Sequence, residues 1–200
     1  AQCGPSSLHQ GAMNNRNDWP AADQVFIAKD DGQVGMGMAS FTIVETGISP
    51  TSVLILFKNY SAYQMTGLIG SAIHKVKTDL GCIAPRTIQF VAGFGIIRLT
   101  HKGFALYNGV DDKLISIDIG PEIFGTDPLT PTADFIEKLN NSAIHLGWAT
   151  QTQDPPMYID ALPVEDTSLT RVFIFDLVAK SWTICDFPFG LGCLQTLYLS

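Results

Sequence analysis

The sequence predicts an all-β protein with a β-propeller architecture, from its frequent turn residues, its short apolar runs and an internal repeat. The 200 residues include 18 glycines and 11 prolines. Between them lie short runs rich in β-branched and aromatic residues, such as 53–57 and 171–175. Strands this short, with turns about every eight to twelve residues, are typical of sandwiches, barrels and propellers. The repeat decides among these architectures.

The expected strands follow one another along most of the chain. Residues 25–27, the turn Asp30-Asp31-Gly32 and residues 33–34 predict a hairpin, because Asp-Gly is a tight-turn signal. The segment 35–38, Gly-Met-Gly-Met, is too short for a phosphate-binding loop and is interpreted as flexible backbone between strands. Further strands are expected at 41–44, 53–57, 62–65, 87–91, 95–99, 104–107, 114–117, 171–175 and 182–184.

The internal repeat favours a propeller. Residues 53–67 and 95–109 share an aliphatic strand, a short polar turn, an aromatic-bearing strand and a closing glycine, and residues 172–185 repeat that shape. The first two copies begin about forty residues apart, which suits a four-stranded propeller blade. About four blade-like repeats fit into residues 1–200. The chain is therefore expected to form a single propeller-type domain, either as a fragment of a ring or as a ring that other segments complete.

One segment departs from the β pattern. Thr130-Pro131 offers a helix N-cap followed by proline at the first helical position, and apolar residues then recur at helical spacing from Phe135 to Ala143. This pattern predicts one short amphipathic helix, inserted between strands within residues 126–150.

Composition excludes several classes of protein. The chain carries 19 acidic and 12 basic residues, a net charge of −7, and has no basic cluster, so specific binding to nucleic-acid phosphates is not expected. Its apolar runs are far shorter than the roughly 20 residues of a membrane-spanning helix. The cysteines are too few and too scattered for a disulfide scaffold and are expected to be reduced and buried: Cys3, Cys82, Cys185 and Cys193. Both ends of the chain look cut, and no targeting signal can be read.

The sequence holds no recognisable catalytic or metal-binding motif. None of the histidines has a second histidine or cysteine at ligand spacing: His9, His74, His101 and His145. The neighbours of Cys82 offer neither a base nor a positive field, so this thiol is expected to be inert. No catalytic residue, metal or cofactor is therefore expected, and the chain is not expected to be an enzyme.

Paired carboxylates are the remaining candidates for chemistry. Asp30-Asp31 and Asp111-Asp112 fall at expected hairpin tips and are interpreted as turn residues. An acid and base pair on one propeller face, as in glycosidases, is the alternative. The segment 160–166 lacks the alternating oxygen ligands of a calcium loop.

Residues 18–116 resemble β-propeller proteins of bacteriophage necks and tails. The resemblance rests on Asp18-Trp19-Pro20, on 30–33, on 53–67, on Asp79-Leu-Gly-Cys-Ile-Ala-Pro-Arg-Thr87 and on 97–116. The family includes the tail tubular protein B and the head-completion proteins of short-tailed phages. Residues 121–170 match no part of it. The resemblance implies a structural virion protein, made in the host cytoplasm, with several copies around the channel through which DNA is ejected.

Partners implied by the resemblance are further copies of the chain and adjoining tail, portal or adaptor proteins. The acidic balance would let DNA pass through the lumen without specific binding. Aromatic residues of the repeats are expected to fill the wedges between blades: Tyr63, Tyr107 and Trp182. Gly81 and Pro85 are expected to bracket the turn that redirects the chain between blades.

Two other functions remain open. A carbohydrate-binding or carbohydrate-cleaving propeller, receptor-binding or sialidase-like, would need exposed tryptophans beside carboxylates on one face. Trp19, Trp148 and Trp182 fall in unrelated positions of the repeat. A cellular scaffold of kelch type ranks last, because its paired-glycine signature is missing.

Overall fold

The computed structural model describes residues 7–9, 24–28, 30–43, 51–66, 73–119, 139, 142–164, 169–191 and 194. Within these residues the regular structure consists of strands and three-residue 3₁₀ helices. The predicted all-β class is therefore confirmed for the described part of the chain.

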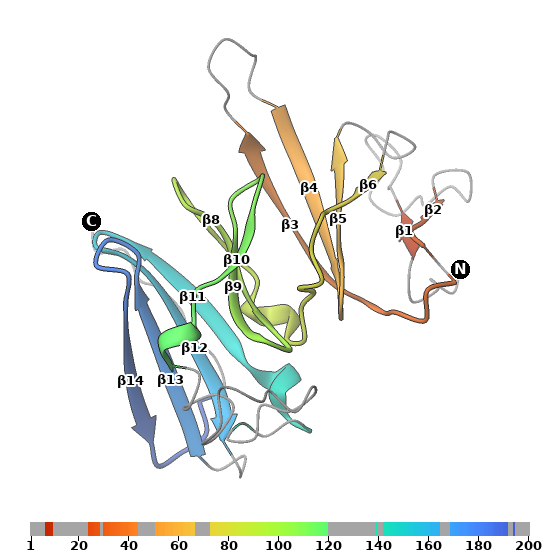
Figure 1. The fold of residues 1–200 in the computed structure, drawn as a ribbon. Coiled ribbons are helices and arrows are strands. Elements are labelled where there is room, and N and C mark those ends of the chain that lie inside the picture. The colour runs from red at the N-terminus through yellow and green to blue at the C-terminus, as the bar shows by residue number, and fades with distance from the viewer. Residues whose placement is uncertain are drawn as a thin grey trace, which may run out of the picture.

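Three four-stranded antiparallel sheets follow one another along the chain (Figure 1). The first sheet comprises β3 (Gly35–Ile43), β4 (Thr51–Lys58), β5 (Ala62–Thr66) and β6 (Ile73–Lys75). The second comprises β7 (Gln89–Val91), β8 (Gly95–Thr100), β9 (Gly103–Tyr107) and β10 (Asp112–Leu114). The third comprises β11 (Trp148–Gln153), β12 (Pro156–Val164), β13 (Leu169–Asp176) and β14 (Ser181–Phe187). Every strand pairs with its neighbour in sequence, so each sheet is a meander.

The N-terminal hairpin is paired differently from the prediction. β2 (Gln24–Phe26) pairs with β1 (Ser7–His9) in a two-stranded sheet, not with the segment after the Asp30–Gly32 turn. The segment 35–38, interpreted as flexible backbone, forms the start of β3 and pairs with β4, with a register shift between Gly35 and Gly37. Cross-strand pairing with β4 therefore outweighs the low strand propensity of glycine.

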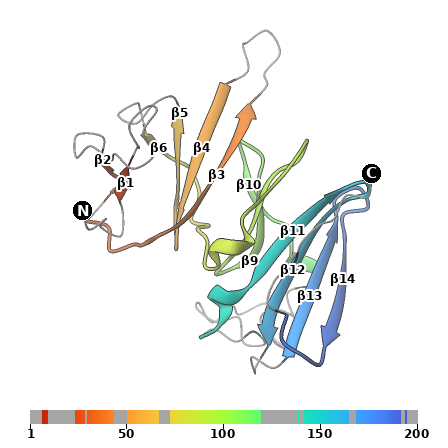
Figure 2. The same ribbon diagram turned by 180° about the vertical axis from the view of Figure 1, so that it is seen from behind.

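The three sheets lie side by side with the second in the middle (Figures 1 and 2). Alternate residues of β8 point to opposite faces, and all six are buried. Ile96 joins a core shared with β4, which includes Ile55 and Phe57. Ile97 and Leu99 join a second core, shared with the third sheet. The second sheet is thus covered on both faces.

The first strands of the three sheets come together. β7 contacts both β3 and β11, although these strands lie far apart in the sequence. The side-chain amide of Gln89 on β7 also donates to the carbonyl oxygen of Ala149 on β11, at 2.9 Å. The short 3₁₀ helix η2 (Pro85–Thr87), which leads into β7, contacts the same two strands.

The helix predicted within residues 126–150 is not present in the described part of that segment. Leu139 forms an isolated bridge with Val164, Ile144–Leu146 is the 3₁₀ helix η4, and β11 begins at Trp148. Leu139 and Ile144 are buried in the core between the second and third sheets. Phe135 and Ile136, which also carried the helical spacing, lie outside the described residues. The expected helix start at 130–131 lies outside the described residues.

The third copy of the repeat is offset by one strand. In the first two sheets the repeated hairpin consists of the second and third strands, β4–β5 and β8–β9. Residues 172–185 instead fall on the third and fourth strands, β13 and β14. The equivalent hairpin of the third sheet is β12–β13. The expected strand at 114–117 also shifts, because β10 ends at Leu114 and the 3₁₀ helix η3 (Ile117–Ile119) follows.

Candidate functional site

A buried arginine joins the second sheet to the chain segment that enters it. Arg98 on β8 is fully buried, and its guanidinium lies 4.3 Å from the ring centroid of Phe57 on β4. It donates to the carbonyl oxygens of Leu80 and Gly81, at 2.7 and 2.9 Å. It also binds both carboxylate oxygens of Asp112, at 3.0 and 2.5 Å. A bidentate pair with further hydrogen bonds is the arrangement in which burying both charges can be compensated.

A buried lysine likewise joins the first sheet to the chain segment that enters it. Lys58 on β4 is buried, and its ammonium donates to the carbonyl oxygen of Ala28 and to the Asp31 carboxylate, each at 2.9 Å. Desolvation works to raise the pKa of Asp31, but the charge of Lys58 and the hydrogen bonds from Lys58, Gln33 and Tyr63 together outweigh it, so this pKa is lowered. Asp31 also accepts the backbone N–H of Gln33, as a turn residue does.

The contacts made by Lys58 and Arg98 have the same position in their sheets. Lys58 and Arg98 both lie on the second strand of their sheet, and each holds the segment that leads into the first strand of that sheet. On the second strand of the third sheet, the buried residue of a charged type is Asp160. Each of the three sheets therefore carries one buried lysine, arginine or aspartate on its second strand.

Around Asp160 the core between the second and third sheets contains a polar cluster. The hydroxyl of Tyr158 lies 2.9 Å from the carbonyl oxygen of Thr87 and 3.1 Å from Asp160 Oδ2. Burial raises the pKa of Asp160 to about 7. Burial also raises the pKa of the nearby Cys82 thiol to about 12, so this thiol stays protonated and unreactive at neutral pH. Its predicted inertness is supported by this environment.

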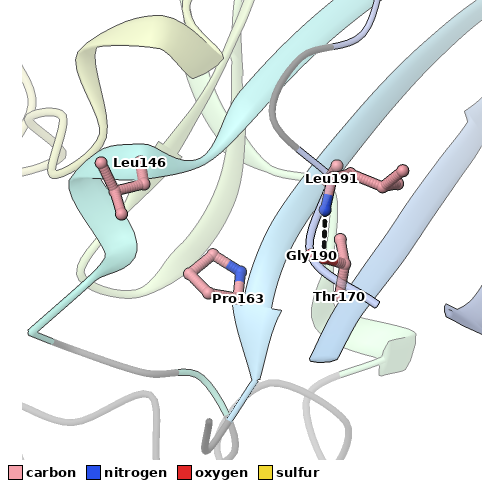
Figure 3. A pocket seen from close by; sticks show the side chains of 6 residues that line it. Leu146, Pro163, Thr170, Gly190 and Leu191 are labelled. Carbon is pink, nitrogen blue, oxygen red and sulfur yellow. Dashed lines mark hydrogen bonds between the residues drawn. The ribbon is translucent and has the colours of Figure 1, made fainter. Parts of the chain in front are cut away.

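A small pocket lies on the face of the third sheet that points away from the second sheet (Figure 3). It encloses about 60 Å³ and is lined by Leu146, Ala161, Pro163, Thr170, Gly190 and Leu191. Thr170 accepts the backbone N–H of Leu191 at 3.0 Å, which holds the segment after β14 against the sheet. Small-molecule sites usually occupy about 300–1,000 Å³ and contain convergent polar groups. This pocket has neither the volume nor the groups for catalysis.

The predicted aromatic wedges are partly correct. Tyr107 lies in the core between the first two sheets and donates to Gln64 Oε1 at 3.0 Å. Trp182 packs between the second and third sheets, and its indole N–H donates to the carbonyl oxygen of Ile115 at 2.8 Å. Tyr63 is not between two sheets: it lies on the other face of the first sheet, with its hydroxyl toward Asp31 and the Lys58 ammonium near its ring.

The remaining candidates for chemistry are separated from one another. Asp111 lies in the turn before β10, as predicted, but Asp112 lies in β10 and pairs with Arg98 instead of forming a turn. His101 lies in the β8–β9 turn, against the ring of Tyr60 at 5.0 Å. Cys185 is exposed, whereas burial was expected. Cys3, Cys193, His9 and Trp19 carry no described side chain.

No group of three or more histidine, cysteine or acidic residues in the described segments could hold a metal ion. Those segments also contain no helix with the length and apolarity to cross a membrane.

Comparisons with models of known protein families, with curated proteins and with solved structures found no match. The function is therefore inferred from the arrangement of the sheets and the contacts between them.

The buried charges were not singled out in the sequence, although a signal for them exists. Arg98 and Asp160 each stand alone within an otherwise uncharged strand, 95–100 and 156–164. A lone charge in an apolar run indicates a buried, paired or titrating group. The partners could not be predicted, because Leu80, Gly81 and Thr87 contribute backbone carbonyl oxygens.

Proposed function

We propose that this chain is a β-propeller module with a structural role in a phage tail or neck. Several copies would surround the channel through which DNA leaves the head. The observation that carries the proposal is the arrangement of the sheets: three successive four-stranded meanders stack face to face, and the first strand of the second sheet contacts the first strands of both neighbours.

This arrangement is the one that propeller blades adopt. In a propeller, four-stranded antiparallel sheets pack around a central axis, and complete rings have about four to eight blades. The described residues supply three such sheets. A complete ring would then need further blades beyond these three.

The contacts between the sheets suit a structural role. Arg98 and Lys58 tie the connecting segments to the sheets with buried ion pairs. Two apolar cores hold the second sheet on both faces. The described residues bring together no set of groups arranged as nucleophile, base and orienting partner.

Charge also supports a channel role. The three first strands, at 35–43, 89–91 and 148–153, contain no acidic or basic residue. In a propeller these strands would line the axis, so the lining would be neutral. A neutral lining, together with a net charge of −7 on the whole chain, would not attract the phosphates of a passing DNA strand.

The alternative carbohydrate-binding propeller has less support from the aromatic residues. Trp182 is stacked on Phe104 within the core, at 4.9 Å between ring centroids. Trp148 is partly covered by the Arg86 guanidinium, 5.0 Å from its ring centroid. Neither pairs with a convergent set of carboxylates, as sugar hydrolysis would need.

The decisive experiment measures the mass of the full chain by light scattering on a sizing column, alone and mixed with neck and tail proteins of a short-tailed phage. We expect a ring-sized oligomer, or one that forms only with those proteins, and a ring with a central hole in negatively stained images. A monomer that binds none of them would refute the structural role. A specific hit on a glycan array would then favour the carbohydrate module.

A further inference from the structure

The contact between the second and third sheets encloses a carboxyl group with incomplete hydrogen bonding. Asp160 is fully buried on β12. Its Oδ2 lies 3.1 Å from Tyr158 Oη, and its Oδ1 has no hydrogen-bond partner among the described residues. The backbone N–H of Ala161 works to lower the pKa of Asp160, but burial outweighs it. A buried carboxylate needs partners for both oxygens, because its charge has lost the solvation of water. A neutral carboxylic acid leaves only a carbonyl oxygen unpaired, which costs far less.

The number of protons that Tyr158 and Asp160 can donate indicates that Asp160 is a neutral acid. The Tyr158 hydroxyl has one proton, and it lies within hydrogen-bond distance of both the Thr87 carbonyl oxygen and Asp160 Oδ2. A carbonyl oxygen can only accept, so the Tyr158 proton satisfies it. The contact between Tyr158 and Asp160 then needs a second proton, which Asp160 supplies when it is protonated. With an ionised Asp160, one of the two contacts would lack a proton.

Among the described residues no cation faces Asp160 to stabilise the ionised form, and His145 of η4, which packs against β12, is exposed. The titratable groups that face Asp160 are Tyr158 on its own strand and Cys82 on the segment before η2, and neither is cationic. β7 and β11 carry no charged residue. Asp160 is paired in register with Ala149 and Phe173, so its cross-strand neighbours are apolar.

The nearest cations of the packed elements are engaged elsewhere. Arg86 of η2 lies over the Trp148 ring. Arg98 of β8 binds Asp112. On β13, Arg171 pairs with Asp186, and Asp176 accepts the amides of residues 178 and 179 in the following turn.

We propose that the contact between the second and third sheets is controlled by a proton: it is closed while Asp160 is a neutral acid donating to Tyr158, and it loosens when Asp160 loses that proton to solvent. Because burial raises the pKa of Asp160 to about 7, the change falls near neutral pH. The proposal concerns this contact alone and holds whatever larger assembly the chain forms.

The direction in which stability changes with pH follows from the pKa of Asp160 in the folded and unfolded states. The pKa of Asp160 is raised from 3.8 to about 7 on folding. Its contribution to stability is complete below the unfolded value and decreases as pH rises toward about 7, because only the folded state then holds the proton. Over that range the ratio of folded to unfolded protein falls about tenfold per pH unit from this group. Above about pH 7 the contribution is lost, and Asp160 is ionised in the folded protein.

The test compares the full-length protein with Asp160→Asn, whose amide can donate to Tyr158 Oη as the neutral acid does but cannot ionise. Urea unfolding is measured from pH 4 to 9. Between pH 5 and 8 we expect the folded-to-unfolded ratio of the native protein to fall by about a hundredfold relative to the variant, with no further divergence at higher pH. Asp118→Asn, an exposed carboxyl in η3, should follow the native profile. Parallel profiles for the native protein and Asp160→Asn would overturn the proposal.

A second measurement keeps the proposal testable if Asp160→Asn does not fold. The infrared spectrum of the native protein should show a protonated carboxyl band at pH 6 that disappears above about pH 7. Over the same range, hydrogen exchange at the amides of β12 and η2 should accelerate beyond the ordinary pH dependence of exchange. A spectrum without the band at pH 6 would show that Asp160 is ionised there and would overturn the proposal.

Discussion

Arg98 compensates several buried polar groups at once, so its removal should be costly. It neutralises Asp112 and satisfies the carbonyl oxygens of Leu80 and Gly81. We expect Arg98→Met to lower the free energy of unfolding by about 3–5 kcal/mol, because an unpaired carboxylate remains buried. Urea unfolding measures this loss.

The double variant Arg98→Met with Asp112→Leu provides the control for the ion pair. It removes the buried charge, so it should recover part of the stability, but the two backbone carbonyl oxygens remain without a donor. Recovery of none of the loss would show that the ion pair is not its main cause.

Gly81 marks the closest approach between the entering segment and the first sheet. A Cβ built at this position would lie 2.2 Å from the backbone carbonyl oxygen of Lys58, which also accepts the N–H of Cys82. Backbone cannot move aside as a side chain can, so we expect Gly81→Ala to cost about 3 kcal/mol. Thermal unfolding measures the change.

Gly93 provides the matched control for Gly81. Its φ of +81° disfavours alanine, but a Cβ there would contact nothing within 4 Å. Gly93→Ala should therefore cost only about 1–2 kcal/mol. Equal losses at the two positions would contradict the steric explanation.

Among the elements, β14 shows how the third sheet is fastened to the second. Trp182 stacks on Phe104 and packs against Phe175, with ring centroids at 4.9 and 4.7 Å. Trp182→Ala should lower the free energy of unfolding by about 3 kcal/mol, because it leaves a cavity between two sheets. The exposed neighbour Thr183 points to the opposite face, and Thr183→Ala should change stability by less than about 0.5 kcal/mol. Urea unfolding of both variants checks the difference.

The strands differ in how well they could be predicted from the sequence. β4, β8 and β13 are rich in aliphatic and aromatic residues, and polar turn residues follow β4 and β8, so these strands were predicted correctly. β11 is a polar strand, Trp-Ala-Thr-Gln-Thr-Gln, and β12 contains two prolines, so neither was predicted. The prolines are tolerated because Pro156 begins β12 and Pro163 lies one residue from its end.

The polar contacts were less predictable than the strands. Arg98 and Asp160 could have been noticed as charges inside apolar runs, but their partners lie in other elements. Leu80, Gly81 and Thr87 act through backbone atoms, which leave no trace in the residue type. Only the packing of the sheets brings them together.

For the whole molecule, the face of the third sheet that points away from the second sheet offers a test of assembly. Ile159 and Ile174 are cross-strand neighbours on the face away from the second sheet, and both remain partly exposed. If a further blade covers this face, Ile159→Lys should weaken assembly at least about tenfold, because it would bury an unpaired charge. Light scattering over a dilution series measures the effect.

Val178→Lys supplies the control for that surface. Val178 is 70% exposed in the turn before β14, so a lysine there should leave both folding and assembly unchanged. An assembly indifferent to Ile159→Lys would mean that this face lies outside the interface.

The burial of the second sheet on both faces has a consequence for synthesis. β8 has no side exposed to water, and half of its core is supplied by β12, β13 and β14, which leave the ribosome after β10. A nascent chain that ends after β10 would therefore present an apolar surface with nothing to cover it, and such surfaces recruit chaperones or aggregate. The second sheet can therefore complete its core only after the strands of the third sheet have been synthesised.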